Sequence, residues 1–185
     1  KLRFTALDRP ELLAEAPELR IRIVADPEAG TLTIRDNGIG LTRQDAIDNL
    51  GTIARSGTAE FLEQLKSREG AGDGDPASLI GQFGVGFYSA FIVADRVVVE
   101  SRHATAGPEA GCRWTSAGEA DFTIETIERE ARGTDVVLHL RDDAKEFLER
   151  FRIASIVRKY ADHLGFPVEM PVETKDEEGE DAEPA

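Results

Sequence analysis

Short stretches in which apolar and polar residues alternate run along much of the chain, and this period of two predicts β-strands. The first pair, 19–24 and 31–35, encloses the segment Asp26–Gly30, whose Pro and Gly predict a turn. Further strands are expected in the second half of the chain. They occupy 96–102, 111–116, 122–127 and 134–140, with a short one at 168–172.

Two short helices are expected between these groups of strands. The first, 43–50, follows the N-cap residue Thr42 and is expected to end at Gly51. The second, 59–66, follows a second N-cap residue, Thr58, and carries its apolar residues on one face.

Two further helices differ in character. Residues 84–94 are apolar nearly all round, which predicts a buried helix. The last helix is expected to begin at Asp142 or Asp143 and to continue through Leu164, where Gly165 stops it. Because the strands after residue 95 follow one another without intervening helices, the sequence predicts a largely antiparallel α+β sheet.

The chain is expected to contain one folded domain, 1–172, and an acidic tail, 173–185. Its opening stretch, 1–7, looks like the last turns of a helix and has no initiator Met, so the domain is expected to lack its first helices. The segment 67–78 combines glycines, a proline and charged residues with little to bury, and is expected to be a mobile loop.

Length and composition narrow the classes of function. With 185 residues and 41% hydrophobic residues, the chain suits one domain with an ordinary core. The formal net charge of −14 opposes binding to nucleic acid or to an anionic membrane. Cys112 is the only cysteine and the histidines lie far apart, so neither a disulfide nor a Cys-based metal site is expected. These features favour a cytoplasmic protein.

Three glycine-bearing segments recur in a fixed order, and together they indicate a pocket for an adenine nucleotide. The first is Asp36-Asn37-Gly38-Ile39-Gly40. Asp-Asn-Gly alone is a common hairpin turn, but the second glycine leaves bare backbone beside a carboxylate at a strand end. An ionised Asp only accepts hydrogen bonds, which matches the exocyclic amine of adenine and not the carbonyl of guanine.

The third segment, Gly81-Gln82-Phe83-Gly84-Val85-Gly86-Phe87, lies at the start of the predicted helix 84–94. The free N–H groups at a helix N-terminus can hold phosphate. Its glycine spacing does not fit the dinucleotide fingerprint, and the P-loop sequence is absent. Glycines that allow tight helix packing are the alternative explanation.

The remaining candidates carry less information by themselves. The second segment, 51–58, places hydroxyl groups and the cation of Arg55 between two helices, but alone it is an ordinary loop. Asn49 can contact a phosphate or ribose oxygen, or cap its helix. Thr134, which follows Gly133, can reach an adenine-bound water, although β-propensity is the favoured explanation for that residue alone.

These segments, extended to 50–58 and 80–91, closely resemble the N-terminal ATPase domain of the ninety-kilodalton heat-shock chaperones, most of all its bacterial high-temperature protein G type. The likeness covers nearly the whole chain. That domain belongs with the gyrase, histidine-kinase and mismatch-repair ATPases. The resemblance implies a two-layer α+β domain of the Bergerat type, in which helices cover one face of a mixed, mostly antiparallel sheet and ATP lies between them.

The resemblance also implies a role for each candidate residue. Asp36 would bind the adenine amine, Gly40 and Leu41 would line the base, and Thr134 would support it through water. Asn49 would contact ribose or phosphate. The segment 67–79 would form part of a lid over the nucleotide. The full set of expected ATP-binding residues is Asp36, Gly40, Leu41, Asn49, Arg55, Gly84, Val85, Gly86, Phe87 and Thr134.

Two positions depart from the usual pattern of the family. Arg55 stands where Lys is common, and Leu41 where Met is common. Both keep the charge or the apolar character, so nucleotide binding is expected to survive, with the Arg fork contacting phosphate differently.

The groups that perform hydrolysis in this family are expected outside the chain. The glutamate that activates water and the asparagine that helps to hold Mg²⁺ would lie upstream of Lys1, and an arginine would come from a following domain. No catalytic or metal-binding residue is therefore expected in this chain, and its own hydrolysis of ATP is expected to be near background.

The function implied is that of the ATP-binding domain of an ATP-dependent chaperone, with ATP or ADP and Mg²⁺ as cofactors. In the intact protein, lid closure and pairing of N-terminal domains within a homodimer would act on client proteins, with co-chaperones as further partners. Two other classes remain open: an ATPase domain of a DNA-handling enzyme of the gyrase or mismatch-repair type, and a non-catalytic interaction module.

Overall fold

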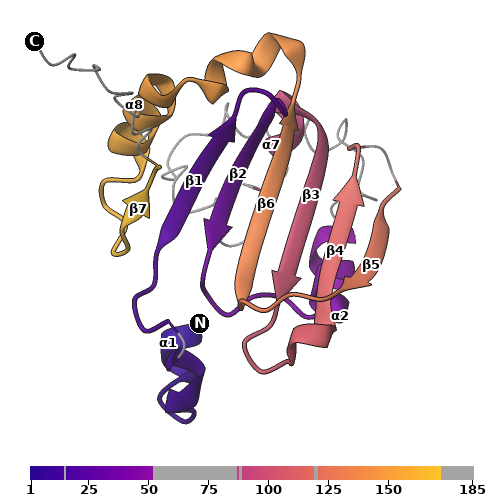
Figure 1. The fold of residues 1–185 in the computed structure, drawn as a ribbon, viewed down its shortest axis with the longest axis vertical. Coiled ribbons are helices and arrows are strands. Elements are labelled where there is room, and N and C mark those ends of the chain that lie inside the picture. Colours follow the sequence, from indigo (N-terminus) through magenta and orange to yellow (C-terminus); the bar gives the residue numbers. More distant parts are fainter. Residues whose placement is uncertain (15, 52–86, 88, 119–120, 172–185) are drawn as a thin grey trace, which may run out of the picture.

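A seven-stranded sheet forms the centre of the computed structural model, which describes residues 1–14, 16–51, 87, 89–118 and 121–171 (Figure 1). The strand order is β5-β4-β3-β6-β2-β1-β7, and every neighbouring pair is antiparallel except β1 and β7, which are parallel. The predicted α+β fold with a mixed, mostly antiparallel sheet is confirmed. The strands are β1 (Ile21–Asp26), β2 (Thr31–Asp36), β3 (Ala94–Arg102), β4 (Gly111–Ser116), β5 (Thr123–Ile127), β6 (Gly133–Leu140) and β7 (Val168–Glu169).

The six longer strands form within two residues of their predicted bounds, because their alternating pattern buries one face of the sheet. β7 is shorter than predicted, since it pairs with β1 at only two positions. The helical elements among the described residues are short. They are α1 (Leu2–Thr5), the 3₁₀ helix η1 (Pro10–Leu13), α2 (Arg43–Asp45), the π-helical turn η2 (Ala46–Leu50), α7 (Ala90–Val93), the 3₁₀ helices η3 (Pro108–Ala110) and η4 (Asp142–Leu148), and α8 (Arg150–Tyr160).

The predicted helix 43–50 is confirmed, and its cap explains where it begins. The Thr42 hydroxyl accepts the N–H of Asp45 at 3.1 Å, and the Asp45 carboxylate accepts the N–H of Thr42 at 2.9 Å. Gly51 is the C-cap, with right-handed helical dihedrals (φ −68°, ψ −35°). The predicted helix 59–66 and the predicted loop 67–78 lie outside the described residues.

The prediction of one continuous helix from Asp142 or Asp143 through Leu164 is wrong. The extended residue Glu149 (ψ 121°) separates η4 from α8, and α8 ends at Tyr160. Phe147 packs against the core, whereas Phe151, one helical turn later in sequence, is 85% exposed. The two segments therefore turn different sides toward the sheet, which a straight helix cannot do.

The prediction of a buried helix over 84–94 is also wrong where it can be compared. The described part, α7, contains no buried residue, and Ile92 is 60% exposed. The helix ends at Val93, because Ala94 already has extended dihedrals and begins β3. Residues 84–86 lie outside the described part of the chain.

The core lies on the face of the sheet that carries α2 and α7, behind the strands in Figure 1. Trp114 at its centre is fully buried, and the rings of Phe87 and Phe122 lie 5.6 and 5.9 Å from it between centroids. Cys112, two residues earlier on β4, is 1% exposed, so both residues pack in the core. Burial also raises the pKa of the Cys112 thiol.

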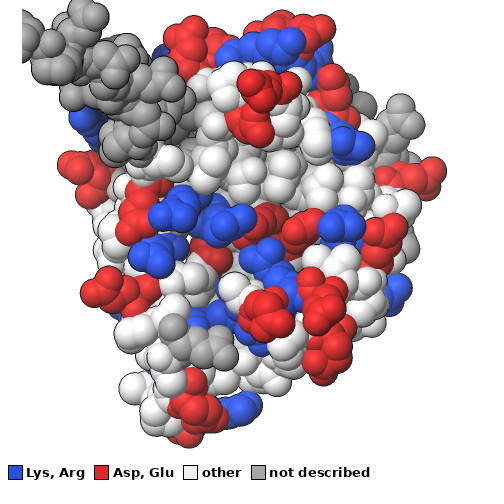
Figure 2. Space-filling model, viewed as in Figure 1, with Lys and Arg blue, Asp and Glu red and all other residues white. Residues whose placement is uncertain are grey.

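The opposite, outer face of the sheet carries charged side chains in place of a covering helix (Figure 2). One row crosses five strands, because directly opposed residues share a face. The row consists of Arg35, Asp135, Glu100, Arg113 and Glu125.

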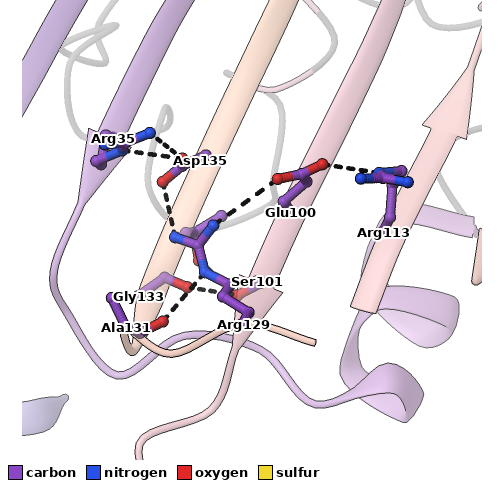
Figure 3. Close-up of polar contacts among 9 residues, drawn as sticks. Arg35, Glu100, Ser101, Arg113, Arg129, Ala131, Gly133 and Asp135 are labelled. Atoms are coloured by element: carbon purple, nitrogen blue, oxygen red, sulfur yellow. Dashed lines mark hydrogen bonds and ion pairs between the residues drawn. The ribbon is translucent and has the colours of Figure 1, made fainter. Parts of the chain in front are cut away.

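Two acids of this outer row, Asp135 and Glu100, face each other, and Arg129 lies between them (Figure 3). Its guanidinium is 2.8 Å from Oδ1 of Asp135 and 4.0 Å from Oε2 of Glu100. Arg35 binds the other oxygen of Asp135 at 2.7 Å, and Arg113 binds Glu100 at 2.7 Å. Each acid of the pair thus has a cation on both sides.

Candidate functional site

The inner face carries a polar row at one end of the sheet. Asp36 on β2 lies opposite Thr134 on β6, and Thr134 lies opposite Ser101 on β3. The next row toward the middle of the sheet is apolar and contains Ile34, Val136 and Val99. The strand register therefore brings a carboxylate and two hydroxyl groups together at the edge of an apolar wall.

The Asp36 carboxylate is partly buried and is held by the backbone. Its Oδ1 accepts the N–H of Gly38 at 2.8 Å, and the Thr134 N–H also favours its ionised form. Burial nevertheless raises the pKa of this carboxyl, and the nearby negative charge of Asp135 adds to the effect. Within the part of the chain that the structure describes, no ion pair is found for Asp36.

Ser101 connects three parts of the row and was not predicted from the sequence. Its Oγ accepts the N–H of Leu41 at 2.8 Å, donates to the carbonyl of Gly133 at 2.9 Å and lies 2.8 Å from Oγ1 of Thr134. It is fully buried. The available signal was a polar residue at a position where the alternation of Val97 and Val99 places the core.

Two glycines allow close backbone contacts at the end of the sheet that carries the polar row. Gly133 has φ +105°, and a Cβ there would lie 2.2 Å from the carbonyl oxygen of Asp36. Gly40 has φ +71°, and a Cβ there would lie 1.9 Å from the carbonyl oxygen of Arg102. Tight contact with the ends of neighbouring strands therefore requires glycine at both positions.

The hairpin alternative for Asp36-Asn37-Gly38 does not hold. The β1–β2 hairpin closes at the predicted turn instead, where Asp26 Oδ1 accepts the N–H groups of Glu28 and Ala29 at 3.0 and 2.9 Å. After β2 the chain continues into α2. Asn37 ties this connection to the start of β1, since its side chain accepts from the N–H of Arg20 and donates to the carbonyl of Glu18 at 2.9 and 2.8 Å.

An apolar cavity of ≈ 530 Å³ lies beside the polar row, between α7 and the inner face of β2 and β6. Ile34 and Val136, from the row next to Asp36 and Thr134, form part of its lining, together with Phe87 and Ile92. The exposure of Ile92 is therefore exposure along this cavity. Asp36 itself lines a second cavity of ≈ 280 Å³ with Gly38, Ile39, Leu19 and Phe166, among others.

The other predicted site residues do not all lie at the polar row. The Leu41 N–H joins the Ser101 network, and its side chain packs partly buried against the core. Phe87 lies against Trp114 and lines the larger cavity. Asn49 is exposed on η2. Arg55, Gly84, Val85 and Gly86 lie outside the described residues.

Metal-ligating side chains do not gather within the described ranges: no group of three or more His, Cys, Asp or Glu residues there is placed to hold a metal ion. Of the helices that the structure describes, none is long and apolar enough to cross a membrane. The candidate site is therefore built from the polar row, the glycines around it and the apolar cavity.

Comparison with known proteins assigns the chain, including these residues, to a family. A family described as "Histidine kinase-, DNA gyrase B-, and HSP90-like ATPase" matches residues 12–135, a range that includes Asp36, Ser101 and Thr134. Three relatives are named "Chaperone protein HtpG". They come from Halorhodospira halophila (54% identity over 99% of this chain), Shewanella loihica (52% over 100%) and Cupriavidus necator (55% over 96%).

The chain spans under a third of the length of these curated relatives, 28% or 29% in each case. It matches their N-terminal part. The expected resemblance to the heat-shock chaperone ATPase domain is thereby confirmed. The chain belongs to the histidine kinase-, DNA gyrase B- and HSP90-like ATPase family.

Proposed function

We propose that the chain binds an adenine nucleotide at the polar row and that it is the ATP-binding domain of an ATP-dependent chaperone. The observation that carries the proposal is the state of Asp36. This carboxylate lines the smaller cavity and lies one row from Ile34 and Val136, which line the larger apolar cavity. Burial raises its pKa, and no ion pair is found for it in the described chain. A perturbed acid beside a concave apolar surface is typical of a binding site.

The base-binding part of the proposal uses the inner face of the sheet. Ile34 and Val136 offer apolar surface to a flat ring, and Asp36 offers an acceptor to its amine. Thr134 lies directly beside Asp36 across the strand pair. Gly40 and Leu41 border the base in this arrangement, since Ser101 holds the Leu41 N–H at the same end of the sheet.

The phosphate-binding part rests on the family and on sequence. We assign Asn49 to ribose or phosphate, Arg55 to the phosphates, and the segment 84–87 to the phosphate cradle, with Mg²⁺ accompanying the nucleotide. Of these residues the structure describes Asn49, which is exposed, and Phe87, which lines the larger cavity. The proposed domain covers 1–172, followed by the acidic tail.

The role of the intact protein follows the names of the relatives. Proteins named "Chaperone protein HtpG" match this chain along its length, which supports ATP-driven action on client proteins. We extend the proposal to ATP hydrolysis by the whole protein, to a homodimer in which the N-terminal domains pair, to co-chaperones as further partners and to a cytoplasmic location.

Calorimetric titration of Mg-ADP into the chain tests the nucleotide site. Wild type should bind, and Asp36→Asn should lose most of the affinity. The amide oxygen would keep accepting the Gly38 N–H, and the NH₂ group would then meet the amine of adenine, which also donates. Asp26→Asn is a matched control, since Asp26 also accepts backbone N–H groups at a strand end but lies at the hairpin turn. Equal affinities for wild type and Asp36→Asn would remove Asp36 from the site.

A further inference from the structure

We propose that Ser101 sets the direction of the hydrogen bonds at the candidate base site, and that it thereby makes the site prefer an amino base over a keto base. The inference deepens the proposed function and rests on it. Ser101 is fully buried, so it acts through its neighbours as a positioning residue and does not touch a ligand.

The Ser101 hydroxyl carries a single proton. A hydroxyl donates one hydrogen bond and accepts two. Of its three partners, the Leu41 N–H can only donate and the Gly133 carbonyl can only accept. Ser101 therefore gives its proton to the Gly133 carbonyl.

The remaining partner, the Thr134 hydroxyl, must then be a donor toward Ser101. The distance between the two oxygens, 2.8 Å, is that of a good hydrogen bond. If Ser101 donated to Thr134 instead, two unprotonated oxygens would face each other over 2.9 Å at Gly133. Only one assignment of the protons satisfies all three contacts.

This assignment determines which hydrogen bonds Thr134 can make with a ligand. Its one proton is committed to Ser101, so its oxygen offers only lone pairs to the site. Asp36, directly opposite on β2, offers lone pairs as well when it is ionised. The site thus presents two acceptors side by side.

A carboxylate alone does not choose between purine bases. It can accept from the amine of adenine, but it can also accept from the N1–H of a keto purine. In the second case the carbonyl at C6 lies next to N1, and an acceptor on Thr134 would oppose it. The two hydrogens of a C6 amine can each meet one of the two acceptors, whereas the C6 carbonyl of a keto base would meet no donor. The committed proton of Thr134 therefore favours the amino base.

Comparison of Mg-ADP with Mg-IDP measures this preference, since the two differ only in the C6 amine or carbonyl and the proton on N1. We expect wild type to prefer ADP. Ser101→Ala frees the proton of Thr134 to turn toward the ligand, so the ratio of the two affinities should fall about tenfold. Ser101→Thr keeps the hydroxyl and should restore the ratio.

Ser116 supplies a matched control on the same inner face. It is 3% exposed and its Oγ donates to the carbonyl of Asp121 at 2.9 Å, two rows away from the polar row. Ser116→Ala also removes a buried serine hydroxyl and should leave the ratio unchanged. Loss of stability alone therefore cannot imitate the expected result.

Thr134→Val provides a second route if Ser101→Ala does not fold. It deletes the acceptor itself and should also lower the ratio. The proposal is overturned if wild type binds ADP and IDP equally, or if Ser101→Ala and Thr134→Val both keep the wild-type ratio. These results leave nucleotide binding intact, whereas a wild-type chain that binds neither nucleotide defeats the proposed function.

Discussion

Asp36 and Asp135 lie one residue apart across the β2–β6 pair but on opposite faces of the sheet. Asp135 is 4% exposed and receives Arg35 on one oxygen and Arg129 on the other. Asp36 is also sheltered from water, but its partners are backbone N–H groups, and burial raises its pKa. Among the described residues, one carboxylate is thus bound by two guanidinium groups and the other by backbone N–H groups.

The difference separates a structural acid from one that is available to a ligand. Asp135 has little left to offer a ligand, because both oxygens already bind guanidinium groups. Asp36 retains unsatisfied acceptor capacity next to apolar surface, which destabilises its charge until a donor arrives. Asp135 is the more deeply buried of the two, yet it is the one whose charge is paired, so the identity of the partners matters more than burial.

Asp135→Ala gives the largest expected change in stability. It leaves Arg35 and Arg129 without their shared acid, and breaking such a buried ion pair costs about 3 kcal/mol. Arg35 is half exposed, which keeps the loss at the lower end of the usual range. Urea unfolding measures it. Affinity for Mg-ADP, corrected for the folded fraction, should not change; a large drop would mean that both acids serve the site.

Asp36→Ala should show the opposite pattern. We expect affinity for Mg-ADP to fall roughly 100-fold, or about 2.7 kcal/mol, as a hydrogen bond to a charged acceptor is lost. The free energy of unfolding should change by less than about 1 kcal/mol, because no ion pair of the described chain is broken. Calorimetry and urea unfolding of the same sample measure the two effects. A loss of stability as large as that of Asp135→Ala would mean that Asp36 is a structural acid as well, contrary to the comparison drawn above.

Arg129→Ala tests whether the outer row depends on the cation between its two acids. Asp135 and Glu100 would then face each other without it, at a cost of about 2 kcal/mol. Glu100→Gln in the Arg129→Ala background should recover part of the loss, since it removes one of the like charges. The double-mutant cycle is measured by urea unfolding. No recovery would show that Arg129 stabilises through packing.

The smallest effect concerns the dependence of stability on pH. Because the folded-state pKa of Asp36 is raised, its contribution to stability is fully present below the ordinary pKa of Asp and is lost as pH rises through the folded-state value. Asp36→Asn lacks this contribution. The stability of the variant relative to wild type should therefore increase with pH across that window. A difference that is flat with pH would mean that burial does not perturb the carboxyl.

The strands and the first glycine segment could be predicted because their causes are local. Alternation defined β4 to the residue, and the Asp36 segment has the composition of a strand end with close backbone contacts. The break at Glu149 could not be found in this way. Phe147 and Phe151 have helical spacing, but only the packed sheet decides which of them is buried.

Only two of the three residues of the polar row could be predicted from the sequence. Asp36 and Thr134 were singled out by neighbouring glycines, and both glycines are needed for close approach. Ser101 has no such neighbour, and its role depends on a register that joins β3 to β6. The outer row depends on the same non-local pairing, together with Arg129 from the β5–β6 connection. Sequence patterns show which residues face inward, but not which of them meet.

The position of Trp114 has an optical consequence. It is the only tryptophan in the chain, and it lies on β4 opposite Val99, one row from Ser101. All indole fluorescence of the chain therefore comes from one fully buried position on the inner face of the sheet. Phe87, which touches both this ring and the larger cavity, links the emission to the contents of that cavity. We therefore expect a ligand that enters the larger cavity to change this emission.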